Sequence, residues 1–285
     1  MEVACSQCIG CRLDHAGMWA SRIEHESSLY DDSNGNCFIT LTYDEEHLPQ
    51  DWSLDKSHFQ KFMKRLRKRY PQKIRYYHCG EYGENCRHGI HTTLCPGCNV
   101  GRPHYHAILF NIDFHDRVLV GQSKGIPHFT SDTLTEIWGH GFTQVGDLTA
   151  QSAGYVARYA LKKVTGTQAE DHYRSIDLTT GEVTYVRPEY ATMSRKPGIG
   201  KEWYEKYKKD MYPSNQTPSV GGGVKNGIPR FYDKLMEKED PEQLEIVKEK
   251  RKEFALDNMH DNTGPRLLDK ATVKLAAIKT LKRDL

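Results

Sequence analysis

The segment from Arg102 to Phe110, RPHYHAILF, places the strongest constraint on the fold of this 285-residue chain. Its last four residues are apolar and predict the middle of a buried β-strand. Side chains alternate between the two faces of a strand, so His104 and His106 lie on one face and Tyr105 on the other. Two neutral imidazoles at this spacing can bind one divalent metal ion. The alternative is that both only form hydrogen bonds at a strand end.

The segments on either side alternate between strand-like and helix-like patterns. β-rich composition with period-two alternation predicts strands at residues 37–43, 73–83, 102–114 and 142–148. Apolar residues at helical spacing predict helices at residues 53–70, 130–141 and 150–164. Ser53 or Asp55 can cap the first helix and Thr149 the last. The order β-α-β-β-α-β-α predicts an α+β fold in which helices pack on an antiparallel sheet.

The composition is that of a folded, water-soluble chain, with 37% hydrophobic and 27% charged residues. The sequence has no run of about 18 apolar residues, and its start, MEVACSQCIGC, lacks the basic and apolar segments of a signal peptide. We therefore expect no membrane partner and a location in a reducing cytoplasm. The eight cysteines are then expected as thiols or metal ligands rather than disulfides.

Positive charge is concentrated in the first predicted helix. Residues 56–75 contain nine Lys or Arg and no acidic residue, although the formal net charge of the chain is only +2. A basic stripe of this kind can bind nucleic-acid phosphates without a high overall pI. Lys64, Lys68 and Arg69 on its polar face are the predicted DNA ligands, and a solvated helix face is the alternative.

Two tyrosines in the last predicted helix are candidate nucleophiles. Tyr155 and Tyr159 are four residues apart, so they share one face of a helix. A tyrosine can attack a phosphodiester that a divalent ion polarises, and a nearby lysine, Lys162, favours the phenolate. The adjacent Lys163 is expected to hold DNA phosphates. When the helix is considered alone, packing of both rings in the core is the alternative.

Cysteine and histidine spacing in the loop 84–101 predicts a structural zinc site. Cys95 and Cys98 have the two-residue spacing of a zinc knuckle. The predicted ligand set of the loop is Cys86, His91, Cys95 and Cys98. A zinc ion would hold together a loop that has little apolar content, and free thiols are the alternative.

The N-terminal cysteines, Cys5, Cys8 and Cys11, have the same spacing and are predicted to bind structural zinc as well. Three thiolates need a fourth ligand, which is either His15 or a cysteine of the loop 84–101. One composite site shared with that loop is therefore also open. The remaining two cysteines, Cys37 and Cys79, lie in predicted strands and are expected in the core.

Seven motifs of this sequence occur in the order found in one known family. They are CIGCR, FITLTY, CGEYG, RPHYHAILF, YVARYALKK, MSRKPGIG and IPRFYDKL, and they span about residues 5–235. RPHYHAILF resembles the His-hydrophobe-His motif of HUH endonucleases, and YVARYALKK resembles their two-tyrosine motif. The sequence thus resembles the replication initiators of microviruses of the gokushovirus type, which are single-stranded DNA phages. The loop 84–101 departs from the family pattern by being longer and richer in cysteine.

This resemblance implies an RRM-like antiparallel sheet with the histidines on a central strand and the tyrosines on an adjacent helix. It also implies a third metal ligand, for which Glu81 at the end of the strand 73–83 is the expected residue. The implied activity is Mg²⁺- or Mn²⁺-dependent nicking and rejoining of single-stranded DNA at the phage origin through a 5′-phosphotyrosine. This reaction starts rolling-circle replication, with a host polymerase and helicase as partners in the cytoplasm of the infected bacterium.

The expected domain division places the nickase in residues 1–212, a linker in 213–229 and a charged helical extension in 230–285. No GxxxxGK[ST] sequence is present, which argues against a fused helicase. A transposase or relaxase with the same site is one alternative, although transposases of this type usually have one tyrosine. A zinc-stabilised nucleic-acid-binding protein without catalysis is the other.

Overall fold

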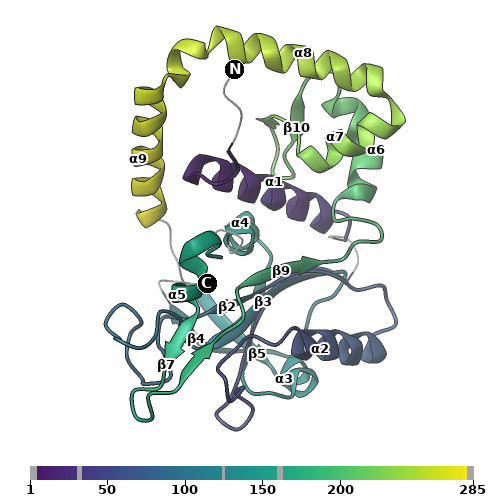
Figure 1. The fold of residues 1–285 in the computed structure, drawn as a ribbon. Coiled ribbons are helices and arrows are strands. Elements are labelled where there is room, and N and C mark those ends of the chain that lie inside the picture. The colour runs from purple at the N-terminus through teal and green to yellow at the C-terminus, as the bar shows by residue number, and fades with distance from the viewer. Residues whose placement is uncertain (1–4, 31–33, 124–125, 159–162, 281–285) are drawn as a thin grey trace. The chain divides into compact units, whose positions relative to one another are not determined.

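The computed structural model describes residues 5–30, 34–123, 126–158 and 163–280, and the chain divides into two compact units. One unit runs from Tyr30 to Ser194 and contains the central sheet (Figure 1). The other combines the N-terminal segment up to Leu29 with the C-terminal part from Arg195. Each unit has a hydrophobic core of its own.

A seven-stranded sheet is the framework of the Tyr30–Ser194 unit, with the strand order β4-β5-β6-β1-β3-β2-β9. The strands are β1 (Asn36–Thr42), β2 (Arg75–Tyr82), β3 (Pro103–Phe110), β4 (Arg117–Ser123), β5 (Ile126–Ser131), β6 (Thr143–Asp147) and β9 (Tyr190–Met193). Neighbouring strands pair antiparallel throughout. The predicted α+β class with a central antiparallel sheet is confirmed, and β3 lies inside the sheet between β1 and β2.

Helices cover both faces of this sheet, with α2 (Lys56–Arg69) and α3 (Asp132–Trp138) on one side and α4 (Ala150–Arg158) on the other (Figure 1). Of the two expected caps of α2, Asp55 is the one used, because its carboxylate accepts a hydrogen bond from the Ser57 backbone N–H. α3 ends at Gly139, which adopts a left-handed conformation with φ of 63°. A second small sheet, β7 (Arg174–Ile176) with β8 (Val183–Tyr185), follows the short helices η2 (Gly166–Gln168) and α5 (Ala169–His172).

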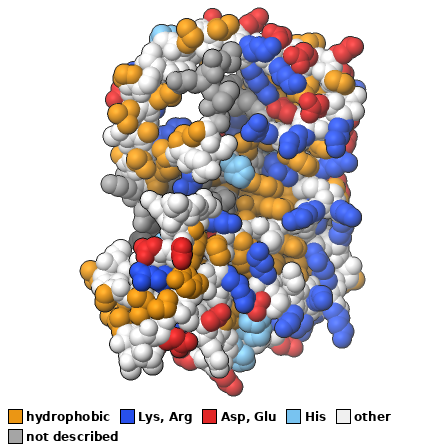
Figure 2. Space-filling model, viewed as in Figure 1, with side chains coloured by type: hydrophobic (Ala, Val, Ile, Leu, Met, Phe, Trp, Pro, Cys, Tyr) orange, Lys and Arg blue, Asp and Glu red, His pale blue; other side chains and the backbone are white. Residues whose placement is uncertain are grey.

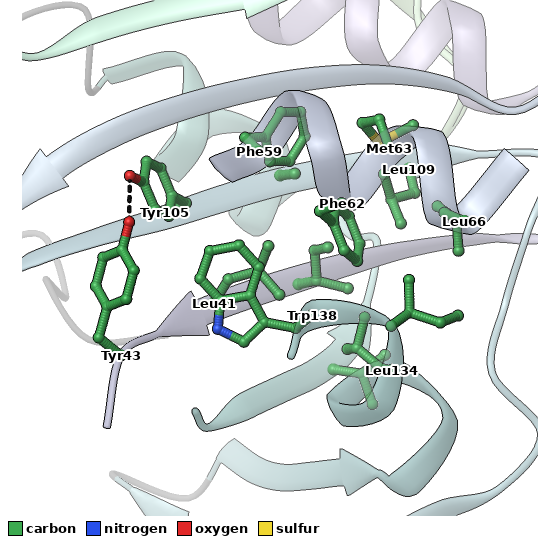
Figure 3. Close-up of a cluster of buried hydrophobic side chains, with 14 of the residues drawn as sticks. Leu41, Tyr43, Phe59, Phe62, Met63, Leu66, Tyr105, Leu109, Leu134 and Trp138 are labelled. Carbon is green, nitrogen blue, oxygen red and sulfur yellow. Dashed lines mark hydrogen bonds between the residues drawn. The ribbon is translucent and has the colours of Figure 1, made fainter. Parts of the chain in front are cut away.

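The larger hydrophobic core lies between the sheet and α2 and α3. Alternation along the strands sends Leu41 of β1 and Tyr105 and Leu109 of β3 to this side, where they meet apolar residues of both helices (Figure 3). Tyr43 and Tyr105 share a hydrogen bond of 2.7 Å in this core. The opposite faces of β1 and β3 therefore carry Thr40 and the two histidines, on the side of α4.

The second unit is mainly helical. Its elements are α1 (Ile9–Ser27), α6 (Lys201–Met211), α7 (Arg230–Glu239), α8 (Pro241–Asp257), η3 (Met259–Asn262), α9 (Gly264–Thr280) and the hairpin β10 (Gln216–Pro218) with β11 (Val224–Asn226). The sequence analysis identified the helical stretch of α8 but not α1, and it described residues 213–229, where the hairpin lies, as a loop. The predicted division into domain, linker and extension stays a prediction.

Side chains of α1 bind the segment at Ile199 and Gly200. The Arg22 guanidinium donates two hydrogen bonds to the Ile199 carbonyl, of 3.0 and 2.9 Å, and the Glu26 carboxylate accepts one from the Gly200 backbone N–H at 2.6 Å. His25 stacks on Trp203 with ring centroids 3.5 Å apart. α1 is thus fixed to α6 by polar and aromatic contacts, which a search for apolar periodicity does not detect. In the described parts of the chain, no helix is both long and apolar enough to cross a membrane.

Candidate functional site

The two histidines of β3 and Glu81 of β2 form one cluster. Strand pairing sets Glu81 directly opposite His104, and directly paired residues of neighbouring strands share a face of the sheet. One Glu81 carboxylate oxygen, Oε1, lies 2.7 Å from His104 Nε2 and 3.4 Å from His106 Nε2. The structure thus brings together the three residues that the sequence analysis assigned as metal ligands.

The second nitrogen of each imidazole is held by a group of the neighbouring backbone or strand. His104 Nδ1 donates to the Arg102 carbonyl at 3.2 Å. His106 Nδ1 and Thr40 Oγ1 share a hydrogen bond of 2.9 Å, because Thr40 is directly opposite His106 in β1. Such contacts orient metal-binding histidines and direct both Nε2 atoms toward the metal. The sequence analysis missed Thr40 and Arg102, although the strand alternation of FITLTY places Thr40 on the same face as the histidines.

Burial and charge make this cluster suitable for a cation. Glu81 and His106 are buried, whereas 17% of the His104 side chain is exposed, so the cluster opens toward solvent at His104. Burial alone would raise the pKa of Glu81, but the hydrogen bonds from His104 and His106 outweigh it and hold that pKa far below its usual range. The carboxylate is therefore charged, and a divalent ion can take the place of the proton that it shares with His104.

The donor set of two imidazole nitrogens and one carboxylate oxygen fits a divalent metal that keeps further coordination positions open. Glu81 is an anionic ligand, and the orienting contacts of His104 and His106 leave both Nε2 atoms for the ion. Three protein ligands on one side of a sheet leave room for a phosphate oxygen and water. Such a set differs from a closed structural site, in which four protein ligands complete the coordination.

Tyr155 of α4 lies beside this cluster. Its ring stands at 82° to the ring of His106, with centroids 5.5 Å apart, and also meets the edge of Phe38. The helix packs by its buried residues Ala153, Val156 and Ala157, which leaves Tyr155 half-buried. Tyr159 and Lys162 lie outside the described residues, and Lys163 is exposed just after them.

A groove of about 480 Å³ begins next to the cluster. Two of its lining residues, Thr40 and Thr42, are the β1 residues that pair with His106 and His104. The other lining residues come from β4, β5, β6 and α3 and include Phe142, of which 69% is exposed. A hydroxyl-rich groove with an exposed aromatic ring on it has the chemistry of a surface that binds single-stranded nucleic acid.

The predicted basic DNA ligands lie on the other layer of the unit. Lys64, Lys68 and Arg69 are exposed on α2, which packs against the face of the sheet opposite the histidines. Figure 2 shows Lys and Arg side chains gathered at the lower right, in the region of α2. Arg69 forms an ion pair of 2.9 Å with Glu136, so the two lysines are the residues of this set more available to a phosphate.

The cysteines of the loop 84–101 come together, but with a different histidine from the predicted one. Cys86, Cys95 and Cys98 surround His88. The predicted ligand His91 is turned away: its Nδ1 lies 2.7 Å from Thr93 Oγ1, and its Nε2 lies 3.5 Å from the Glu84 carboxylate. His88 stands two residues after Cys86 in the same Cys/His-rich run, and spacing alone did not distinguish the two histidines.

The N-terminal trio also comes together, at the start of α1. Cys11 Sγ lies 3.5 Å from Cys8 Sγ and 3.9 Å from Cys5 Sγ. The Cys8 backbone N–H donates to Cys5 Sγ and is the main cause that lowers the pKa of Cys5 to about 7. Within the described residues, no fourth Cys, His, Asp or Glu joins this group, and His15, the expected fourth ligand, is not part of it.

Comparison with known proteins gives a consistent class. Residues 36–164 match the model of a family described as replication-associated protein, ORF2 type. The chain is 32% identical over 268 residues to the replication-associated protein ORF2 of Spiroplasma virus 4, covering 89% of this chain and 74% of that protein. It is 35% identical over 265 residues to the replication-associated protein VP4 of Bdellovibrio phage phiMH2K, covering 88% and 74%.

A third relative, the replication-associated protein ORF4 of Chlamydia phage 1, is 27% identical over 244 residues, covering 82% of this chain and 53% of that protein. No solved structure matches the chain. The matched segment 36–164 contains β1 to β6 and the His–Glu cluster, which places the chain in the class of viral replication-associated proteins. More narrowly, the chain belongs to the replication-associated proteins of microviruses, and the predicted resemblance to that family is confirmed.

Proposed function

We propose that this protein cuts and rejoins single-stranded viral DNA at the replication origin, and that this reaction starts rolling-circle replication. The main support is the contact of Tyr155 with His106, because it sets a nucleophilic side chain beside a group of metal ligands. The names of the microvirus relatives agree with a role in replication and favour it over a transposase or relaxase.

Glu81, His104 and His106 would hold the divalent cation, for which we propose Mg²⁺ or Mn²⁺. The bound ion supplies Lewis acidity toward a phosphate oxygen. Thr40 and the Arg102 carbonyl hold the two imidazoles in the orientation that binding requires. The exposed side of His104 is where the DNA backbone approaches, and the groove that starts at Thr40 and Thr42 receives the adjoining nucleotides.

The phenol oxygen of Tyr155 is the proposed nucleophile. Its bond to phosphorus forms as the bond from phosphorus to the 3′ oxygen breaks, which leaves a 5′-phosphotyrosine and a free 3′-OH. The phenolic proton leaves to solvent, and the departing 3′ oxygen takes one up. Lys162 and Lys163 would favour the phenolate and hold phosphate oxygens. One phosphoester is exchanged for another, so rejoining needs no ATP.

A second tyrosine, Tyr159, allows a second cut. After one round of synthesis it would attack the regenerated origin while the first 5′ end is still bound to the protein. The 3′-OH that this cut releases then attacks the first phosphotyrosine and closes a circle. A host polymerase would extend the first 3′-OH and a host helicase would separate the strands, in the cytoplasm of the infected bacterium.

The test is cleavage of an origin oligonucleotide labelled at its 3′ end. A 5′-phosphotyrosine leaves the labelled fragment on the protein, whereas a 5′ label is released with the 3′-OH fragment. We expect a Mn²⁺-dependent, label-bearing protein band, and mass spectrometry of its peptides should locate the nucleotide on Tyr155 or Tyr159. Release of both labels as free DNA would contradict a tyrosine intermediate.

Matched variants separate catalysis from binding. His104→Ala and His106→Ala should remove cleavage while DNA binding stays close to wild type, because the ion typically supplies several kcal/mol of transition-state stabilisation. His260→Ala, which changes an exposed histidine of the other unit, is the control. Wild-type cleavage by the His104→Ala/His106→Ala double variant would favour a DNA-binding protein without catalysis.

A further inference from the structure

The loop 84–101 contains a buried cluster built only from sulfur and one histidine. Cys86, Cys95 and Cys98 are all buried and form a separate small core. The large apolar side chains of the same loop do not share it: Leu94 is 77% exposed and Ile90 37%. Three buried thiols beside an imidazole give little hydrophobic stabilisation, so this loop needs another source of cohesion.

The distances within the cluster agree with a tetrahedral metal site. His88 Nδ1 lies 3.7 Å from Cys86 Sγ, 3.4 Å from Cys95 Sγ and 3.5 Å from Cys98 Sγ. With Zn–S of about 2.3 Å and Zn–N of about 2.1 Å at a tetrahedral angle, a sulfur and a nitrogen ligand are about 3.6 Å apart. All three distances lie close to this value. Four protein ligands leave no position for substrate, so the site is structural rather than catalytic.

The same cluster joins two segments that are distant in the sequence. Cys98 pairs with Ser175 of β7 through an isolated bridge, and its Sγ lies 3.3 Å from Ser175 Oγ. The Ile176 backbone N–H donates to the Gly97 carbonyl at 2.7 Å, where a Cβ on Gly97 would come within 2.6 Å of the Ile176 carbonyl oxygen. The cysteine knuckle therefore lies directly on the β7–β8 hairpin.

The base of this loop is the end of the β2–β3 hairpin, which carries the proposed metal ligands of the cleavage site. The Gly83 N–H donates to the Arg102 carbonyl, the same oxygen that accepts from His104. Gly101 approaches so closely that a Cβ there would lie 2.3 Å from the Gly83 carbonyl oxygen. The loop thus begins and ends next to the strand ends that carry Glu81 and His104, and its order bears on their position.

We propose that Cys86, His88, Cys95 and Cys98 bind one structural Zn²⁺, which fixes the β2–β3 loop to the β7–β8 hairpin and steadies the strand ends that carry Glu81 and His104. Binding through Nδ1 leaves the ring hydrogen of His88 on Nε2. The Leu178 backbone N–H, which lies 3.2 Å from that nitrogen, then turns to water. This zinc site is independent of the proposed cleavage reaction.

The test is the zinc content of protein purified under reducing conditions, in a background where Cys5, Cys8 and Cys11 are Ser so that the N-terminal trio contributes none. This background protein should contain one equivalent of zinc. His88→Ala and Cys95→Ser should contain none, and His91→Ala, the matched control in the same loop, should keep one. Co²⁺ substitution should give the tetrahedral absorption bands of a three-sulfur, one-nitrogen site.

Zinc removal should also lower the thermal unfolding temperature in the background protein and in His91→Ala, but not in His88→Ala. If His88→Ala does not fold, His88→Cys supplies a fourth thiolate and should restore one equivalent. A background protein without zinc, or retention by His88→Ala with loss by His91→Ala, would overturn the proposal. Because the readout is metal content, its failure is distinct from failure of the cleavage assay.

Discussion

The ring of Tyr155 lies against the ring of His106, at 82° and with centroids 5.5 Å apart. This contact connects α4 to the central strand β3, and it is what sets the candidate nucleophile beside the candidate metal ligands. Neither residue alone indicates chemistry, since a helical tyrosine and a strand histidine are common in protein cores. Their proximity, next to Glu81, makes the cluster a functional site with assignable roles.

Thr40→Val should weaken metal binding without removing a ligand. The variant keeps the shape of the side chain but loses the hydrogen bond that orients His106. Loss of an orienting contact of this kind typically costs about 10- to 100-fold in metal affinity or activity. We expect a higher Mn²⁺ concentration for half-maximal cleavage and recovery at saturating Mn²⁺. Thr42→Val is the control, because Thr42 Oγ1 donates to the Phe142 carbonyl and not to a histidine. Equal effects of both substitutions would contradict an orienting role for Thr40.

Phe142→Ala should weaken binding of single-stranded DNA. Its exposed ring lines the groove beside Thr40 and Thr42, where a base can stack on it. Stacking of one base on an aromatic side chain contributes about 1–3 kcal/mol, so we expect the Kd to rise roughly 5- to 150-fold in fluorescence anisotropy with an origin oligonucleotide. Phe254→Ala, an equally exposed phenylalanine of α8, should leave the Kd unchanged. An unchanged Kd for Phe142→Ala would exclude the groove as the DNA path.

Replacement of Lys64, Lys68 and Arg69 by Ala should weaken DNA binding and flatten its salt dependence. Each phosphate contact that is lost lowers the slope of log K against log salt by about 0.7 for a single strand. The Arg69–Glu136 ion pair predicts that Lys64 and Lys68 account for most of the change. Lys248, Lys250 and Lys252 of α8, replaced together, are the comparison set. An unchanged slope would show that this helix face is only solvated, as its place on the layer opposite the histidines allows.

The helical unit should lose stability as the pH falls from 7 to 5. Burial of His25 against Trp203 and Tyr232 lowers its pKa from 6.5 to about 4, with a smaller opposing effect from the Pro218 carbonyl. The folded state thus keeps His25 neutral while the unfolded state takes up a proton below about pH 6.5, so protonation favours unfolding. A shift of this size predicts about 2 kcal/mol less unfolding free energy at pH 5 than at pH 7.

Urea unfolding at the two pH values measures this difference, with His25→Phe and His260→Phe compared. His25→Phe removes the titrating group and should lose most of the pH dependence, whereas His260→Phe, at an exposed position, should keep it. His140 of the sheet unit also has a pKa lowered to about 4 by burial, and it contributes the same sign in both variants. Equal pH dependence in the two variants would show that His25 does not titrate as the structure indicates.

The sequence predicted the parts of this fold that local patterns determine. Alternation in RPHYHAILF and FITLTY and helical spacing in 53–70 depend on neighbouring residues, so β1, β3 and α2 were found with their buried faces. α1 was missed because its buried face includes Arg22, His25 and Glu26, whose partners lie far away in the chain. His88 was missed for a related reason: Cys86, Cys95 and Cys98 are equally compatible in sequence with either loop histidine, and only the path of the loop brings His88 to them.

The two tyrosines distinguish an initiator from a simple nickase. One nucleophile suffices to cut, but release of a circle needs a second cut while the first 5′ end is still covalently held. Tyr155 and Tyr159 are one helical turn apart in sequence, and Tyr155 lies beside His106. Each single Phe variant should therefore still cleave an origin oligonucleotide, at a reduced rate if the tyrosines are not equivalent. The double variant should be inactive.

A replication assay separates the two roles further. With either single variant, covalent protein–DNA adducts or overlong strands should accumulate in place of closed circles, because rejoining requires both tyrosines. Tyr185→Phe, which changes an exposed tyrosine of β8, is the control and should release circles normally. Complete loss of cleavage in Tyr155→Phe alone, with normal circles from Tyr159→Phe, would assign all of the chemistry to Tyr155. The protein would then act as a single-tyrosine enzyme, with Tyr159 as a packing residue beside its nucleophile.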